Sequence, residues 1–168
     1  MTPGSAGWWA GKIRQTKRHL LARVPAQERE AAAAWLSLSH LAVFDAMHVA
    51  DRRHGLDVVQ ALRAGGTTDR EVLLAGLLHD AGKGQTGLLP RIFHSLAQAH
   101  ITWPGLAVGW LPSMRRSLAR LRDHAEASAR IAEAAGCSPR TVELIRWQDA
   151  PRDPEFGEIG RASCRERV

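Results

Sequence analysis

The 168-residue sequence contains no tyrosine and only two cysteines, Cys137 and Cys164. Two cysteines do not make a disulfide framework, so the default expectation is a reducing, cytoplasmic setting. No apolar run approaches the roughly 18 residues that a membrane span needs, and the N-terminus has no apolar core of the signal-peptide type. We therefore expect neither structural disulfides nor a transmembrane segment.

Residues that favour β-strands are also scarce. Val, Ile and Thr together supply 22 residues, whereas Ala and Leu supply 46. This balance favours helices and argues against a β-sandwich or barrel. The predicted fold class is all-α, and the length suits one domain with a sizeable core rather than two.

Lysine is rare in a chain that is nevertheless basic. Three Lys and 20 Arg against 17 acidic residues give a net charge of +6. The charges are dispersed, and the densest basic stretches run from Lys12 to Arg23 and from Arg115 to Arg122. We therefore do not expect nucleic-acid binding as the main role, although a basic helical nucleic-acid binder is one alternative. A basic surface equally suits an anionic small substrate such as a nucleotide.

Helical periodicity and capping signals predict about seven or eight helices and no strand. Pro25 suits the first turn of a helix, Gly65 and Gly66 end another, and Thr68–Glu71 has the pattern of a capping box. The helix that follows this box is apolar almost all round, so we expect it to be buried. The predicted helices cover residues 25–36, 38–47, 54–64, 68–80, 88–100, 113–121, 124–135 and 139–147.

Three segments differ in composition. Residues 1–24 are poorly patterned, and residues 25–157 form the predicted helical domain. Residues 158–168, EIGRASCRERV, resemble the translated read-through of a widely used sequencing adapter, which predicts a non-native tail. On this interpretation the natural chain continues past Gly157, and the helical domain is truncated at its C-terminal end. An ordinary disordered tail is the alternative.

His79 and Asp80 stand at the end of the most apolar predicted helix, where four of the six preceding residues are Leu. A carboxylate and an imidazole at the end of a buried helix are costly unless they are paired or bind a metal ion. His54 opens the preceding predicted helix, 25 residues before His79. These 25 residues are enough for one helix, a turn at Gly65 and Gly66, and a second helix that runs back beside the first. We therefore expect His54 to lie near His79 and Asp80.

Two imidazoles and a carboxylate suit a first-row divalent ion such as Mn, Fe, Co or Ni, or Mg with more water ligands. A water molecule activated by such an ion can attack a phosphoester. The plainer alternative is a histidine that caps a helix, an aspartate that faces solvent, and a His54 bonded only to backbone. Asp80 is the residue best placed to act both as ligand and as base.

Around these residues the chain resembles the HD-domain superfamily of metal-dependent phosphohydrolases. His54 in RRHGLDVVQAL, His79 and Asp80 in LLHDAGKG and, more loosely, His124 in DHAEASARIAEAAG carry the resemblance over about residues 51–147. The resemblance implies a single HD-type helical bundle with a His, His-Asp, Asp metal site. It also implies hydrolysis of phosphate esters, with Lys83 near a substrate phosphate and His124 at a second metal ion or at the phosphate.

The chain departs from the family pattern at the Asp that closes the site. Asp149 and Asp153 are the candidates, and we take Asp149 as the predicted ligand. Many relatives have a pair of histidines where Arg146 and Trp147 stand here. In some subgroups the closing Asp comes well after that pair, and here it would then lie beyond Gly157.

The sequence therefore predicts a cytoplasmic metal-dependent phosphohydrolase that acts on a phosphomonoester or phosphodiester. Its partner would be a phosphorylated small molecule, of which a nucleotide is one example. One alternative is a non-catalytic HD-like module that binds a nucleotide or a partner protein as a regulator. Another is an inactive fragment of an HD hydrolase.

Overall fold

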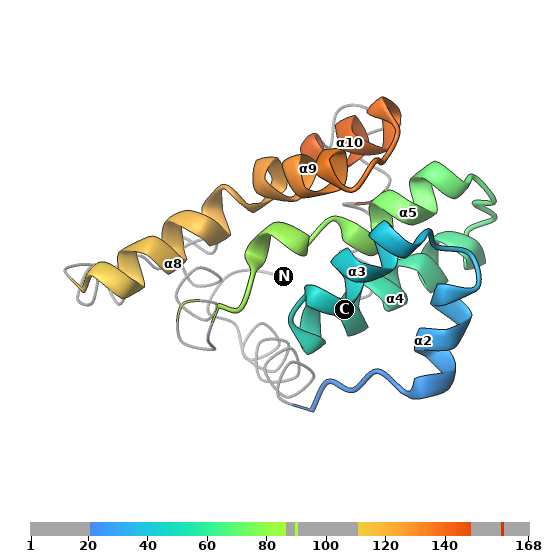
Figure 1. Cartoon of the computed structure of the whole chain (residues 1–168), viewed down its shortest axis with the longest axis horizontal. Helices are drawn as coiled ribbons and strands as arrows, with labels where there is room; N and C mark the ends of the chain where they lie inside the picture. The colour runs from blue at the N-terminus through green and yellow to red at the C-terminus, as the bar shows by residue number, and fades with distance from the viewer. Residues whose placement is uncertain (1–20, 87–89, 91–110, 149–158, 160–168) are drawn as a thin grey trace, which may run out of the picture.

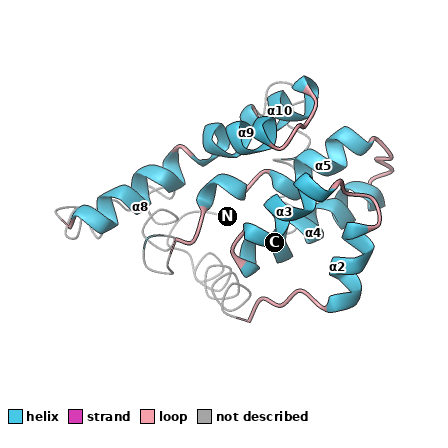
Figure 2. Ribbon diagram, in the orientation of Figure 1, coloured by secondary structure: helices cyan, strands magenta, loops and turns pink. Residues whose placement is uncertain are grey.

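The computed structural model describes residues 21–86, 90, 111–148 and 159, and every regular element among them is helical (Figures 1 and 2). The predicted all-α fold class is confirmed. The predicted helix over residues 88–100 and most of the N-terminal segment 1–24 lie outside the described residues. The described elements are seven α-helices and one 3₁₀ turn: α2 (Ala26–Ala33), α3 (Leu38–Ala46), α4 (Val49–Ala64), α5 (Arg70–Leu78), η1 (Ala81–Lys83), α8 (Pro112–Arg122), α9 (His124–Ala134) and α10 (Pro139–Arg146).

Helix α5 lies at the centre of the hydrophobic core. All seven residues from Val72 to Leu78 are buried, as the sequence predicts for this helix. The helix contacts both α4 and α10, and its side chains join those of Phe44, Val58 and Leu144 in one cluster. Burial of each such aliphatic side chain contributes about 1.5 to 3 kcal/mol, so the end of α5 is held in a fixed position.

Helix α4 begins earlier than the sequence predicts. It starts at Val49 rather than at His54, because the Nδ1 atom of His48 accepts a hydrogen bond from the Ala50 N–H at 3.2 Å and caps the helix. His54 therefore lies inside the helix, in its second turn. The predicted stop at Gly65 is confirmed.

Caps and ion pairs join the first turns of α5 and α10. Asp69 caps α5 by accepting from the Glu71 N–H at 2.9 Å, one residue later than the Thr68–Glu71 pattern predicts. The Glu71 side chain instead bonds to Ser138, the predicted cap of α10, and to Arg140. The Arg140 guanidinium group also reaches Asp69 at 2.6 Å, so the N-terminal ends of the two helices are tied together.

Of the predicted tail over residues 158–168, the structure describes Ile159 alone, and its side chain is fully buried in the core cluster. The predicted domain boundaries stay predictions. Within the described part of the chain, no helix has both the length and the apolar character that crossing a membrane requires.

Candidate metal centre

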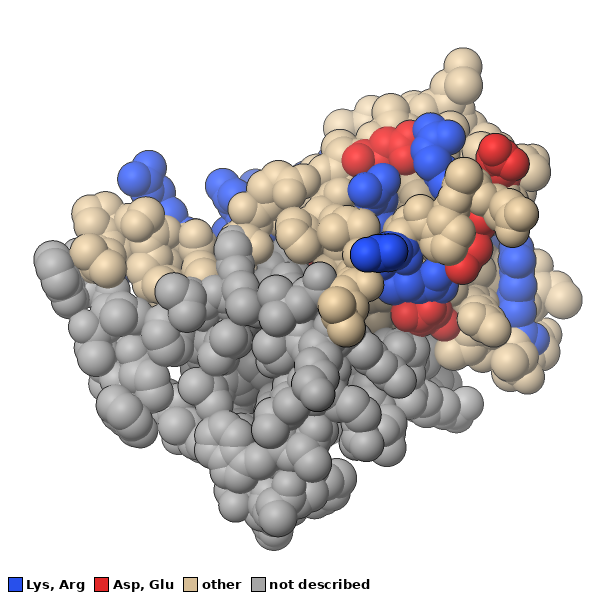
Figure 3. Space-filling model, turned by 90° about the horizontal axis from the view of Figure 1, so that it is seen from below, with Lys and Arg blue, Asp and Glu red and all other residues tan. Residues whose placement is uncertain are grey.

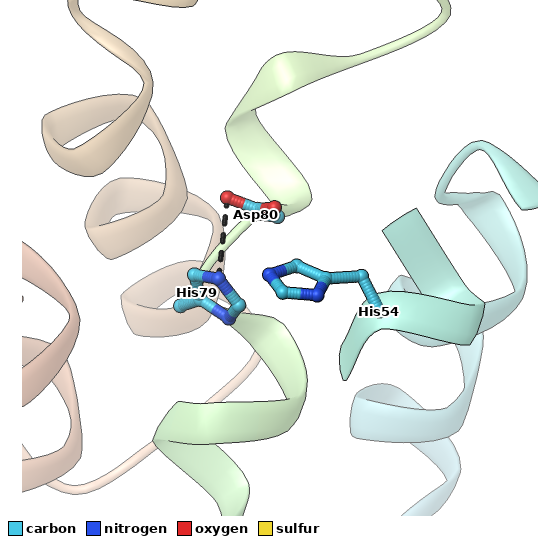
Figure 4. Close-up of side chains that lie close together, drawn as sticks. All are labelled: His54, His79 and Asp80. Atoms are coloured by element: carbon cyan, nitrogen blue, oxygen red, sulfur yellow. Dashed lines mark ion pairs between the residues drawn. The ribbon is translucent and has the colours of Figure 1, made fainter. Parts of the chain in front are cut away.

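Three side chains from neighbouring elements converge at the end of α5 (Figure 4). His54 projects from α4, His79 follows the last residue of α5, and Asp80 precedes η1. One potential ligand atom from each residue lies within 4.8 Å of the other two, and the centroids of the two imidazole rings are 5.2 Å apart. Ligand atoms that share an ion with bonds near 2.1 Å lie about 3 to 4 Å apart, so this set is close to the spacing of a coordination sphere.

Two glycines let the surrounding helices approach this closely. A Cβ at Gly55, the neighbour of His54, would clash with the carbonyl oxygen of Leu77 on α5. A Cβ at Gly82, on η1, would lie 2.5 Å from the carbonyl oxygen of His124 on α9. The backbones of α4 and α9 therefore touch the segment that carries His79 and Asp80, which places their histidines beside it.

Backbone carbonyl groups orient two of the imidazole rings. Nδ1 of His79 lies 2.9 Å from the oxygen of Gly76, and Nδ1 of His124 lies 2.7 Å from the oxygen of Leu121. Because a carbonyl oxygen only accepts, Nδ1 donates in both cases, and Nε2 of the neutral ring carries a lone pair. Each Nε2 faces Oδ1 of Asp80, at 3.4 Å from His79 and 3.6 Å from His124. Histidines that bind metal ions are typically held by such a hydrogen bond at the other ring nitrogen.

Asp80 is buried, and its two carboxylate oxygens have different surroundings. Oδ2 accepts a hydrogen bond from Nζ of Lys83 at 2.6 Å. Oδ1 has no hydrogen-bond partner among the described residues. Burial by itself raises the pKa of Asp80, but the nearby His79, Lys83 and other imidazoles lower that pKa well below its usual value. The carboxylate is therefore ionised at neutral pH with one oxygen unsatisfied.

No described hydrogen-bond donor lies at the point where His79 and Asp80 face each other. Burial lowers the pKa of His79 to about 4, although the charge of Asp80 opposes the shift, so this ring is neutral at neutral pH. The Nε2 lone pair of His79 then points at Oδ1, Nε2 of His124 faces the same oxygen, and no described hydrogen-bond donor satisfies that oxygen. A buried acceptor without a donor costs about 1 to 3 kcal/mol. A divalent cation removes this cost, and nitrogen and carboxylate ligands suit the predicted first-row ions or Mg. The residues therefore fit the predicted ion.

The remaining predicted site residues have different positions. His124 lies outside the set within 4.8 Å, but its ring reaches Asp80. Lys83 contacts Asp80, and its predicted contact with a substrate phosphate stays a prediction. Asp149 and Asp153, the predicted closing ligands, lie outside the described residues.

Sequence reasoning missed two residues that support the site. The Ser128 hydroxyl group accepts a hydrogen bond from the Gly82 N–H at 2.8 Å in a buried contact, and the Gln148 amide donates to the His79 carbonyl at 3.3 Å. Gly82 follows Asp80 by two residues, and the lack of a side chain there permits the close approach of α9. The only signal of this role is the absence of a side chain at Gly82, which a turn explains equally well.

A scan against protein-family models, a search of the curated proteins and a search of the solved structures each find no match. The resemblance to the HD-domain superfamily therefore rests on the LLHDAGKG motif and its flanking histidines. The convergence of His54, His79 and Asp80 depends on how α4 and α5 pack, and it does not by itself identify a family.

Proposed function

We propose that the protein is a metal-dependent phosphohydrolase of the HD type that acts on phosphomonoesters or phosphodiesters, nucleotides included. The observation that carries the proposal is the orientation of acceptors around the buried Asp80 carboxylate. Nε2 of His79 and of His124 point at Oδ1 of Asp80, and His54 lies beside them. A divalent cation is the ligand that such a set of nitrogen and oxygen atoms favours.

The side chains of the cluster have distinct roles in this proposal. His54, His79 and Asp80 hold the ion, and the carbonyl group of Gly76 keeps the His79 lone pair directed at the site. When bound, a divalent ion supplies a Lewis acid that polarises a phosphoryl oxygen and activates water. Asp80 is the carboxylate within the cluster, so we assign to it the acceptance of the proton from the attacking water. Lys83 pairs with Asp80 at the edge of the cluster, where an anionic substrate would bind.

The ion pair between Lys83 and Asp80 favours a second candidate function. Lys83 already neutralises the charge of Asp80 without any ion. A protein that keeps this arrangement would be a non-catalytic HD-like module that binds a nucleotide or a partner protein. The two candidates differ in turnover rather than in fold.

The experiment compares metal content and turnover in four proteins. Metal-free wild type is titrated with Mn, Fe, Co, Ni and Mg ions by calorimetry, and hydrolysis is measured on p-nitrophenyl phosphate, bis-p-nitrophenyl phosphate and a panel of nucleotides. His79→Ala and Asp80→Asn remove one ligand each. His40→Gln is the matched control, because His40 is a partly buried histidine on α3 outside the cluster.

We expect His79→Ala and Asp80→Asn to lose metal binding and turnover together while far-ultraviolet circular dichroism shows unchanged helicity. The His40→Gln control should keep both. Turnover that persists in either site variant would refute the assignment. Metal binding by the wild type without hydrolysis of any of these phosphoesters would favour the non-catalytic module.

A further inference from the structure

Helix α8 carries positive charge that the described acidic residues barely balance. Its eleven residues include four arginines and no Asp or Glu. Arg122 pairs with Asp123, just past the end of the helix, and Arg116 donates to the Pro112 carbonyl of its own first turn. Figure 1 shows α8 extending away from the other described helices. In Figure 3 the Lys and Arg side chains over this end have no acidic side chain of the described residues beside them, whereas both signs alternate over the other helices.

One of these arginines lies against the segment that follows the metal cluster. Helix α8 contacts η1, and Arg120 is in its last turn. A Cβ at Gly84 would lie 3.2 Å from Nη1 and 3.5 Å from Cδ of Arg120, so the arginine side chain covers this glycine at contact distance. Gly84 has φ of +59°, a conformation that glycine adopts readily and most other residues do not. The absence of a side chain at Gly84 thus leaves room for the Arg120 guanidinium group.

Arg120 and Lys83 make one edge of the cluster positive. Lys83 is adjacent to Gly84 and bonds to the buried Asp80 carboxylate at 2.6 Å. Arg120 is exposed, and no ion pair joins it to an acidic residue within the described part of the chain. The ammonium group of Lys83 is therefore already paired with the Asp80 carboxylate, whereas the guanidinium group of Arg120 is accessible to a ligand from solvent.

The proposed function supplies the chemistry of that ligand, and this inference rests on it. We propose that Arg120 binds the phosphoryl oxygens of the substrate at the edge of the metal cluster. A guanidinium group offers two parallel N–H donors to two oxygens of a phosphate, which a lysine cannot do. The family resemblance assigns phosphate contact to Lys83, but the ion pair of Lys83 with Asp80 leaves Arg120 as the available cation on this edge.

The test measures binding of inorganic phosphate directly. Calorimetry in EDTA gives the phosphate Kd of wild type, Arg120→Met, Arg120→Lys and Arg115→Met. Arg115→Met is the matched control, because it removes the same charge from the same helix five residues away, on a different face. The Mn affinity of each protein is measured separately, without phosphate.

We expect Arg120→Met to raise the phosphate Kd about tenfold, as loss of a charged hydrogen-bonded pair does, and Arg120→Lys to raise it about threefold. Arg115→Met should change it less than about twofold, and the Mn affinity should be the same in all four proteins. Equal effects of Arg120→Met and Arg115→Met, no phosphate binding by the wild type, or a joint loss of Mn affinity in Arg120→Met would each overturn the inference. Phosphate binding that depends on Arg120 in a protein without turnover would count against the hydrolase proposal alone.

Discussion

A methyl group at Gly82 should separate η1 from α9 and weaken the fold at the metal cluster. An added Cβ would lie 2.5 Å from the His124 oxygen, 2.6 Å from the Ser128 nitrogen and 2.7 Å from Cβ of Ala127. Carbon–oxygen contacts normally lie at about 3.3 Å, so the segments must move apart by roughly 0.8 Å. Because two of the three atoms are backbone atoms, no change of rotamer relieves the clash.

The magnitude of the Gly82→Ala effect follows from three contributions. Overpacking of this kind costs up to about 3 kcal/mol, and loss of the hydrogen bond from the Gly82 N–H to Ser128 costs about 1 kcal/mol. The lower entropy of the unfolded alanine chain offsets about 1 kcal/mol. The net loss of about 3 kcal/mol lowers Tm by about 6 to 12 °C in a chain of this size. Mn affinity should fall as well, because a shift of η1 displaces Asp80, which directly precedes it.

Gly65→Ala is the control for this prediction. Gly65 ends α4 with φ of −78°, and a Cβ there approaches no atom closer than 3.3 Å. An alanine at such a position should leave stability unchanged or raise it by about 0.4 to 1 kcal/mol. Urea denaturation and thermal unfolding measure both variants. If Gly82→Ala unfolds at the same urea concentration as Gly65→Ala, the close contact between η1 and α9 does not exist in the protein.

Two further predictions concern stability. In EDTA, the free energy of unfolding should be constant between about pH 7 and 8 and should fall by up to about 3 kcal/mol from pH 6.5 to 4. The reason is that burial lowers the pKa of His79 to about 4, so the unfolded chain takes up the proton first. Urea titrations across this range should show a smaller fall in His79→Ala, and an equal fall would contradict the prediction. Ile159→Ala should cost about 2 to 4 kcal/mol, since its side chain is fully buried in the core. A loss below about 1 kcal/mol in the same assay would mean that Ile159 does not pack there.

Local signals in the sequence account for most of what could be predicted. The Leu-rich run before His79 and the glycines after α4 predict a buried helix that returns toward His54, and the two imidazoles do meet. That prediction depends only on the length of the two helices between His54 and His79 and on the turn at Gly65. It therefore holds although α4 starts at Val49, before His54. Ser138 followed by a proline likewise predicts the start of α10.

Contacts between distant helices could not be predicted in the same way. The approach of α9 depends on Gly82 and Ser128, which are 46 residues apart and carry no periodic signal. The direction of the His79 lone pair depends on a hydrogen bond to Gly76 within its own helix, and only the ring rotamer decides whether that bond forms. Residue types therefore indicated which side chains meet, and packing decided which atoms of these side chains face one another.

The Asp80 carboxylate links stability to metal binding. It is buried and ionised, so it needs positive charge, and Lys83 satisfies only Oδ2. The other oxygen faces Nε2 of His79, which cannot donate while that ring is neutral, and Nε2 of His124, and it has a hydrogen bond to neither. A fully satisfied structural network would place a donor at Oδ1, and none of the described residues does so. The folded chain therefore retains an unfavourable contact that a cation relieves and the unfolded chain lacks, which gives the cation a higher affinity for the folded state.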